Sequence, residues 1–257
     1  MKANVMMKTL SLAVLGLAGM GFAGGAMAAC PASAAAPVGA WSSQTVLSGG
    51  ALTITTPGLK LTECKMSASL GTSAASLAQV QDNTPANETR FRIRAYIDPT
   101  ALTSFGLTDA VQVFTANSQN PFPAAGGRRQ IFNVNLVPGA GGAKRLQVIA
   151  ACNNGTTYRC ISTMTTDLPA TATVFEADLK IGAGAAGELK YWVNAAAGGE
   201  PVTTTGTIAN LDNTGWVGVD AAVLGLSAPT PSYRTAHQGQ IVAFDEYDSR
   251  RQTYIGL

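Results

Sequence analysis

Two carboxylates lie two residues apart in the sequence Glu-Ala-Asp-Leu-Lys-Ile, which ends at Ile181. Glycoside hydrolysis with retention of configuration needs two carboxyl groups that flank the sugar bond, one as nucleophile and one as acid. In the known hydrolase motif Glu-x-Asp-x-x-Glu the two glutamates form that pair, but Ile181 stands where the second glutamate is required. We therefore predict that Glu176 and Asp178 lie on the polar face of an amphipathic strand and do not form this catalytic pair.

Other catalytic groups are scarce. The chain has one histidine, His237, in the sequence Ser-Tyr-Arg-Thr-Ala-His-Gln-Gly-Gln. A histidine-dependent lyase site or a Ser/His/Asp triad would have to use it, and the chain has no Gly-x-Ser-x-Gly turn to present a nucleophile. We expect a lone histidine in a loop to be solvated. We therefore predict no catalytic residue.

The sequence contains more residues suited to ligand binding than to catalysis. In residues 189–194, Trp192 alternates with Tyr191 and Val193, so the pleat of a strand places it on the opposite face, where we expect it to be exposed. Residues 91–98 and 175–181 alternate in the same way. The candidate glycan-binding residues lie on the polar faces of these strands: Trp192, Lys190, Asn194, Arg92, Arg94, Tyr96, Glu176 and Asp178. Aromatic rings edged with hydrogen-bonding groups suit a sugar. The alternative assigns these residues to cross-strand ion pairs and to packing under a loop.

The elements that must position these residues are strands. Apolar and polar residues alternate with a period of two in several short segments, and Gly-rich turn clusters at 120–127, 138–144, 182–187 and 195–201 separate them. No helical period occurs outside the amino-terminal segment. This pattern predicts an all-β protein, an antiparallel β-sandwich of the jelly-roll type. We assign 41–257 to a single such domain, preceded by an Ala/Pro-rich lead-in at 29–40.

The carboxyl-terminal sequence carries a resemblance. Phe244-Asp-Glu-Tyr-Asp-Ser-Arg-Arg251, followed by Tyr254-Ile-Gly256, resembles the last strand of concanavalin A-like, laminin G-like jelly rolls of bacterial extracellular proteins. The segments at 90–99, 188–194 and 217–226 look like sheet strands of the same class. The resemblance implies a fold and leaves function open, because the class is functionally diverse.

The same segment interrupts its apolar period at Asp245-Glu246, which predicts a local bulge. Jelly rolls of this class often carry a structural Ca²⁺, and Asp245 and Asp248 are candidate ligands for one. A simpler role for Asp248, Arg250 and Arg251 is an ion-pair cap on the last strand, where charges discourage edge-to-edge pairing. We predict no other cofactor.

The amino terminus indicates export. Lys2 and Lys8 precede a Leu/Ala/Gly run that ends at Ala26-Met-Ala28, so we predict a cleaved signal peptide at 1–28, no membrane span after its removal, and a secreted or periplasmic protein. Four cysteines in an exported chain indicate two disulfides. Cys152 and Cys160 flank a short loop and form the expected pair, which leaves Cys30 with Cys64. Two other connectivities, and acylation of Cys30 as in a lipoprotein, are the alternatives.

Charge limits the partners. The chain has 17 Lys and Arg against 15 Asp and Glu, and loss of the two signal-peptide lysines makes these numbers equal, so we predict no nucleic-acid partner. The leading hypothesis is a secreted, non-catalytic jelly-roll domain that binds a polysaccharide, a cell-surface glycan or another extracellular surface. The alternatives are a glycosidase or lyase with an unrecognised site built from Arg92, Arg94, Tyr96 and Glu176, and a structural envelope protein.

Overall fold

The computed structural model describes residues 30–35, 39–60, 62–118, 129–153, 161–195 and 199–256. The predicted signal peptide, 1–28, lies outside the described residues. Among the described residues, no helix is long and apolar enough to cross a membrane.

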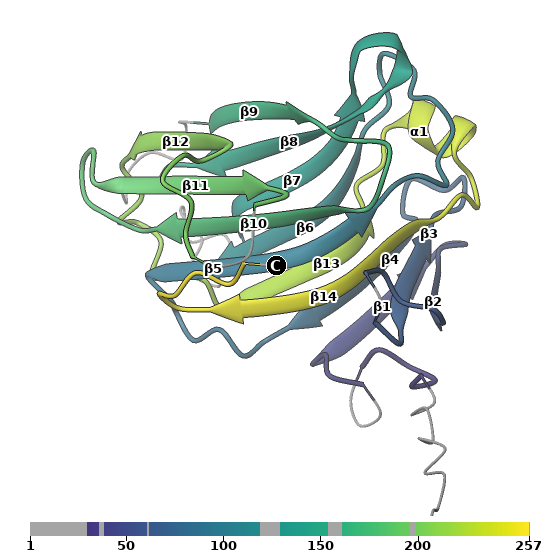
Figure 1. Ribbon diagram of the computed structural model, residues 1–257, viewed down its shortest axis with the longest axis horizontal. Coiled ribbons are helices and arrows are strands. Elements are labelled where there is room, and N and C mark those ends of the chain that lie inside the picture. The colour runs from purple at the N-terminus through teal and green to yellow at the C-terminus, as the bar shows by residue number, and fades with distance from the viewer. Residues whose placement is uncertain are drawn as a thin grey trace, which may run out of the picture.

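Two seven-stranded antiparallel sheets make up the fold, and Figure 1 shows the second sheet lying in front of the first. The first sheet has the order β1-β4-β13-β6-β7-β8-β9. Its strands are β1 (Ser43–Leu47), β4 (Leu77–Asp82), β6 (Val111–Ser118), β7 (Arg129–Pro138), β8 (Lys144–Ala151), β9 (Ile161–Asp167) and β13 (Ala221–Ser227). A short 3₁₀ turn, η1 (Ala140–Gly142), joins β7 to β8.

The second sheet has the order β12-β11-β10-β5-β14-β3-β2. Its strands are β2 (Ala51–Thr55), β3 (Lys65–Ser69), β5 (Arg90–Asp98), β10 (Thr173–Lys180), β11 (Gly187–Val193), β12 (Gly206–Leu211) and β14 (Val242–Arg250). The predicted all-β antiparallel sandwich is therefore confirmed.

Strand β5 shows why these residues form this sheet. Its apolar residues recur at every second position, and Phe91, Ile93 and Ile97 enter the core between the sheets. Side chains of the first sheet, among them Phe114 and Phe132, belong to the same core. A period of two puts one row of side chains on each face of a strand, so the intervening polar residues of β5 must point outward.

The last strand is interrupted as predicted. The pairing of β14 with β5 shifts register between Asp245 and Asp248, and Glu246 has a φ of 49°, so a bulge lies at the point where the apolar period fails. Asp245 then turns toward the loop before β3: its Oδ2 accepts a hydrogen bond from the Leu59 N–H at 2.6 Å and a very short one from the Thr62 hydroxyl.

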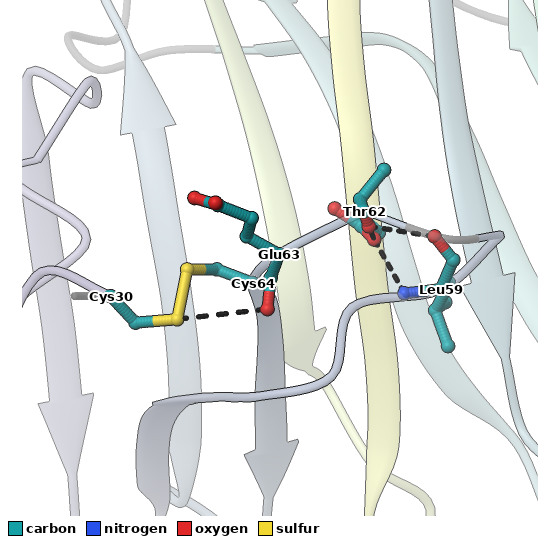
Figure 2. Close-up of a disulfide and its surroundings, with 6 residues drawn as sticks. Cys30, Leu59, Thr62, Glu63 and Cys64 are labelled. Carbon is teal, nitrogen blue, oxygen red and sulfur yellow. Dashed lines mark hydrogen bonds between the residues drawn. A yellow bond between two sulfur atoms is a disulfide. The ribbon is translucent and has the colours of Figure 1, made fainter. Parts of the chain in front are cut away.

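Figure 2 shows this loop beside the disulfide that joins Cys30 to Cys64, with an S–S distance of 2.02 Å. That predicted pair is confirmed. Cys152 is also disulfide-bonded, and Cys160, its predicted partner, lies outside the described residues.

One prediction about the last loop is wrong. Residues 231–236 form a short helix, α1 (Pro231–Ala236), with Thr230 as its N-cap and proline at its first position. His237 follows it and is fully buried, and its ring packs against the rings of Phe105 and Tyr233. We expected this histidine to be solvated, since the sequence does not show that the loop folds inward.

Candidate functional site

The candidate site is the outer face of the second sheet, the face turned away from the core. Strands β5, β10 and β11 lie side by side in its middle. Their register brings most of the predicted residues together: Arg92 lies opposite Asp178, Arg94 opposite Glu176, Glu176 opposite Trp192, and Asp178 opposite Lys190. Directly opposite residues of antiparallel strands point to the same face, so these side chains form one surface.

Arg92 is the centre of this surface and is fully buried. Its Nη2 donates to Asp178 Oδ2 at 2.7 Å, and its Nη1 donates to Glu200 Oε2 at 3.1 Å. Its guanidinium carbon lies 5.1 Å from the centre of the Trp192 ring, within the range of a cation–π contact. A buried arginine needs such partners, because an isolated buried charge is strongly destabilising.

Residues from beyond β14 cover this centre. We call Tyr254, Ile255 and Gly256 the strap. In Figure 1 the yellow chain after β14 doubles back and passes in front of β5. The Ile255 N–H donates to Glu176 Oε1 and the Gly256 N–H donates to Glu176 Oε2, both at 2.9 Å. The strap therefore holds both oxygens of this carboxylate.

Further contacts hold the strap, among them a hydrogen bond from Arg250 Nη1 to the Tyr254 carbonyl at 3.2 Å. Arg94 Nη1 donates to the Gly256 carbonyl at 2.8 Å. The Tyr254 ring lies edge-on to Trp192 at 6.0 Å between ring centres, and 5.6 Å from the Arg92 guanidinium carbon. The prediction that Trp192 is exposed is therefore wrong: only 2% of it is accessible. Its outward direction was inferred correctly, and a segment remote in the sequence covers it.

A second cover lies over the other end of the face. Leu59, from the loop that Asp245 holds, packs on Tyr96 together with Val174 and Ala243. Tyr96 is buried there. Its ring belongs to this small apolar cluster.

The open part of the face is its rim beside β11. Three side chains are exposed there: 44% of the Arg90 side chain, 40% of Glu200 and 36% of Lys190 is accessible. Arg90 forms a two-pronged ion pair with Asp178, and this hydrogen bonding raises its pKa. Asn194 is exposed at the end of β11, where its side chain accepts from the Val174 N–H at 2.9 Å.

Three buried N–H groups on this face have no hydrogen-bond partner among the described residues: Arg92 Nε, Arg94 Nε and Trp192 Nε1. Glu176 Oε1 lies 3.9 Å from Arg92 Nε, close enough for an ion pair but too far for a hydrogen bond. Leaving a buried donor unpaired costs about 1–3 kcal/mol, so a cluster of three is unusual for a purely structural surface.

Sequence reasoning missed Glu200 and the role of the strap. Glu200 lies within the Gly-rich turn cluster at 195–201, which carries no signal for its contact with Arg92. The Tyr-Ile-Gly sequence is part of the carboxyl-terminal resemblance, but no pattern in it indicates which surface it contacts.

The predicted calcium ligands have other partners. Asp245 holds the loop at Leu59, and Asp248 forms an exposed ion pair with Arg250 at 3.0 Å, as the strand-cap interpretation predicts. Arg251 pairs instead with Glu88. Within the described ranges, no group of three or more histidines, cysteines or acidic residues could hold a metal.

A second buried polar cluster lies at α1. His237 Nε2 is 2.9 Å from Asp109 Oδ2, and His237 Nδ1 is 3.1 Å from the Thr103 hydroxyl. Asp109 Oδ2 also accepts from the Gly106 N–H at 2.6 Å. Burial raises the pKa of Asp109, but the hydrogen bonds from His237, Gly106 and Ser232 outweigh it and hold the pKa below its usual value.

No family model matches the chain, and no curated protein matches it. Solved structures do match its fold. An endo-β-1,4-glucuronan lyase from the fungus Trichoderma reesei has a TM-score of 0.58 and 12% identity, with 82% of this chain and 91% of that chain covered. A cellulose-induced protein has a TM-score of 0.52 and 15% identity, covering 82% and 90%. The binding domain of botulinum neurotoxin serotype C1 has a TM-score of 0.50 and 10% identity, covering 83% and 45%. Identities this low show the fold alone.

Proposed function

We propose that this protein is an exported, non-catalytic polysaccharide-binding domain and that the outer face of the second sheet is its ligand surface. The observation that carries the proposal is the cluster of unpartnered donors, Arg92 Nε, Arg94 Nε and Trp192 Nε1, beside an aromatic ring. Polysaccharides offer many hydroxyl and ring oxygens that accept hydrogen bonds, and their rings have an apolar face that packs on aromatic side chains.

The structural neighbours support a polysaccharide as the ligand. One is named for an activity on glucuronan and another for its induction by cellulose, and both share the fold over about nine-tenths of their own length. The Cys30–Cys64 disulfide supports an oxidising compartment outside the cytoplasm, where such ligands occur.

The geometry favours binding over catalysis. Both oxygens of Glu176 accept backbone N–H groups of the strap, so neither oxygen is free to reach a substrate while the strap is in place. Tyr254 is close enough to Glu176 to be affected by its charge: burial, followed by this charge, raises the Tyr254 pKa. A general base works best with a pKa near the working pH, so this shift is in the wrong direction. Tyr96, which the alternative enzyme site would use, lies under Leu59.

The test is retention of the protein on a panel of polysaccharides that includes glucuronan and cellulose. Arg90 is the exposed arginine at the rim of the face, and we expect Arg90→Ala to weaken binding roughly fivefold, a loss of about 1 kcal/mol. Arg145→Ala is the matched control, since Arg145 is an exposed arginine that also pairs with an aspartate, Asp167, but lies on the first sheet.

We expect the control to bind like the wild type, and we expect no new reducing ends and no unsaturated products in any incubation. Failure of the wild type to bind any polysaccharide, or equal losses in the two variants, would overturn the proposal. Release of products from a polysaccharide would favour the enzyme.

A further inference from the structure

The strap is attached to the outer face in an unusual way. No backbone–backbone hydrogen bond ties Ile255 or Gly256 to the rest of the described chain. Its hydrogen bonds to the sheet all involve side chains: Ile255 and Gly256 donate to Glu176, Arg94 donates to the Gly256 carbonyl, and Arg250 donates to the Tyr254 carbonyl at 3.2 Å. Gln252 and Thr253, which lead into it, are exposed. A segment held by a few side-chain contacts, without strand pairing, can open at low cost.

The strap also leaves the surface beneath it incompletely paired. It satisfies Glu176 and one nitrogen of Arg94, but Arg92 Nε, Arg94 Nε and Trp192 Nε1 keep no partner among the described residues. A ligand with more acceptors than this segment could pair with those three donors as well. It would then gain hydrogen bonds that the strap does not form.

We propose that the strap occupies the inner half of the polysaccharide site and that the ligand displaces it. This inference rests on the proposed function and adds to it the regulation of the site and the class of ligand. The strap and the ligand compete for the same groups. The free energy of ligand binding to the wild-type protein is therefore reduced by the free energy needed to displace the strap.

The contacts of the strap indicate what the ligand must offer. Two neighbouring N–H groups donate to the two oxygens of Glu176. Two neighbouring hydroxyl groups on one sugar ring supply the same pair of donors to a carboxylate. The Tyr254 ring marks the place of a pyranose ring beside Trp192, and the Gly256 carbonyl marks an acceptor for Arg94. The ligand is therefore a pyranose polymer with a free pair of neighbouring hydroxyls.

The test compares a strap-release variant with the wild type. In Tyr254→Ala/Gly256→Pro, the ring is lost and proline removes the N–H that donates to Glu176. Proline also cannot adopt the φ of 74° found at Gly256. Gly256→Pro alone is the milder second variant. Gln252→Ala is the control, since Gln252 is exposed just before the strap. Unfolding curves establish that each variant is folded.

The probes are cello-oligosaccharides, whose rings keep neighbouring hydroxyls free, and a glucan whose linkage leaves no neighbouring pair free. We expect release to strengthen binding of cello-oligosaccharides by about tenfold, a change of about 1.4 kcal/mol. We expect no gain for the second glucan or in the control. Glu176→Gln placed in the release variant should remove the gain, because an amide has only one acceptor oxygen.

The outcomes separate the two proposals. If the wild type binds and the release variant binds equally well, the inference about the strap fails and the proposed function stands. If neither protein binds any polysaccharide of the panel, the proposed function fails with it. If light scattering shows a wild-type dimer that becomes monomeric on release, the strap binds a second copy of the chain, and displacement by a polysaccharide is overturned.

Discussion

The cluster around Arg92 and the cluster around His237 contain similar groups but complete their hydrogen bonds to different degrees. Arg92 and His237 are both fully buried, and each lies beside at least one carboxylate and two aromatic rings. Both ring nitrogens of His237 have partners, and Asp109 accepts several hydrogen bonds. On the outer face, two arginine nitrogens and the Trp192 nitrogen have none among the described residues.

This difference separates a structural cluster from a candidate binding surface. The His237 cluster joins α1 to the loop before β6. The Asp109 carboxylate and both ring nitrogens of His237 have hydrogen-bond partners within it. Tyr233 beside it keeps an unpartnered hydroxyl, so the contrast concerns those groups rather than every polar atom. Buried hydrogen-bond donors are nearly always paired in folded proteins. Several unpaired buried donors on one surface therefore indicate that the surface serves ligand binding rather than stability.

The largest expected effect comes from removing the carboxylate of the complete cluster. Asp109→Ala leaves His237 Nε2 and the Gly106 N–H without their acceptor, and we expect a loss of about 3 to 5 kcal/mol in the free energy of unfolding. Denaturant unfolding measures it. Asp167→Ala is the control, because Asp167 forms an exposed pair with Arg145 and should leave the midpoint nearly unchanged. Equal losses would mean that the His237 cluster contributes no more than a surface pair.

A smaller effect tests the comparison between the two tryptophans. Trp192 and Trp216 are equally buried, but Trp216 Nε1 donates to the Ala151 carbonyl at 3.2 Å, whereas Trp192 Nε1 has no partner among the described residues. We expect Trp216→Phe to cost about 1 to 2 kcal/mol more than Trp192→Phe, because only the former leaves a buried carbonyl without its donor. Thermal and denaturant unfolding of both variants checks this. A larger loss for Trp192→Phe would show that its nitrogen is used in the folded protein.

The sequence predicts the direction of side chains better than their burial. The period of two in residues 91–98 correctly separates Ile93 and Ile97 from Arg92 and Arg94, because alternation is a local property of a strand. It also leads correctly to the antiparallel sandwich and to the bulge at Asp245. Residues 173–179 of β10, by contrast, are buried on both faces, which no local pattern in a mixed sequence of Glu, Asp and apolar residues indicates.

The burial of the outer face depends on contacts over long stretches of sequence. Glu176 is held by Ile255 and Gly256, and Arg92 by Glu200. His237 is buried for the same reason, since its partner Asp109 lies in a different loop. Local periodicity carries no information on such contacts, so the sequence shows which residues share a face but not which segment covers them.

The smallest expected effect concerns the strap at alkaline pH. The Tyr254 pKa is raised above the ordinary value of 10.0, chiefly by burial and then by the nearby Glu176 carboxylate. The unfolded chain therefore loses this proton before the folded one does. The stabilising contribution of neutral Tyr254 is complete below pH 10.0 and is lost as the pH rises through the raised pKa.

An ionised Tyr254 beside Glu176 favours release of the strap, so between about pH 9 and about pH 11 the wild type should lose more stability than Tyr254→Phe. Denaturant unfolding across this range measures the difference. Tyr233 and Tyr247 also have raised pKa values, but both are present in the two proteins, so their contributions cancel in the comparison. Because binding competes with the strap, polysaccharide retention by the wild type should rise over the same range while that of Tyr254→Phe stays constant. If the stability of the wild type and of Tyr254→Phe changes with pH in the same way, the strap does not respond to ionisation of Tyr254. The cluster around Arg92 would then be as firmly held in the fold as the cluster around His237.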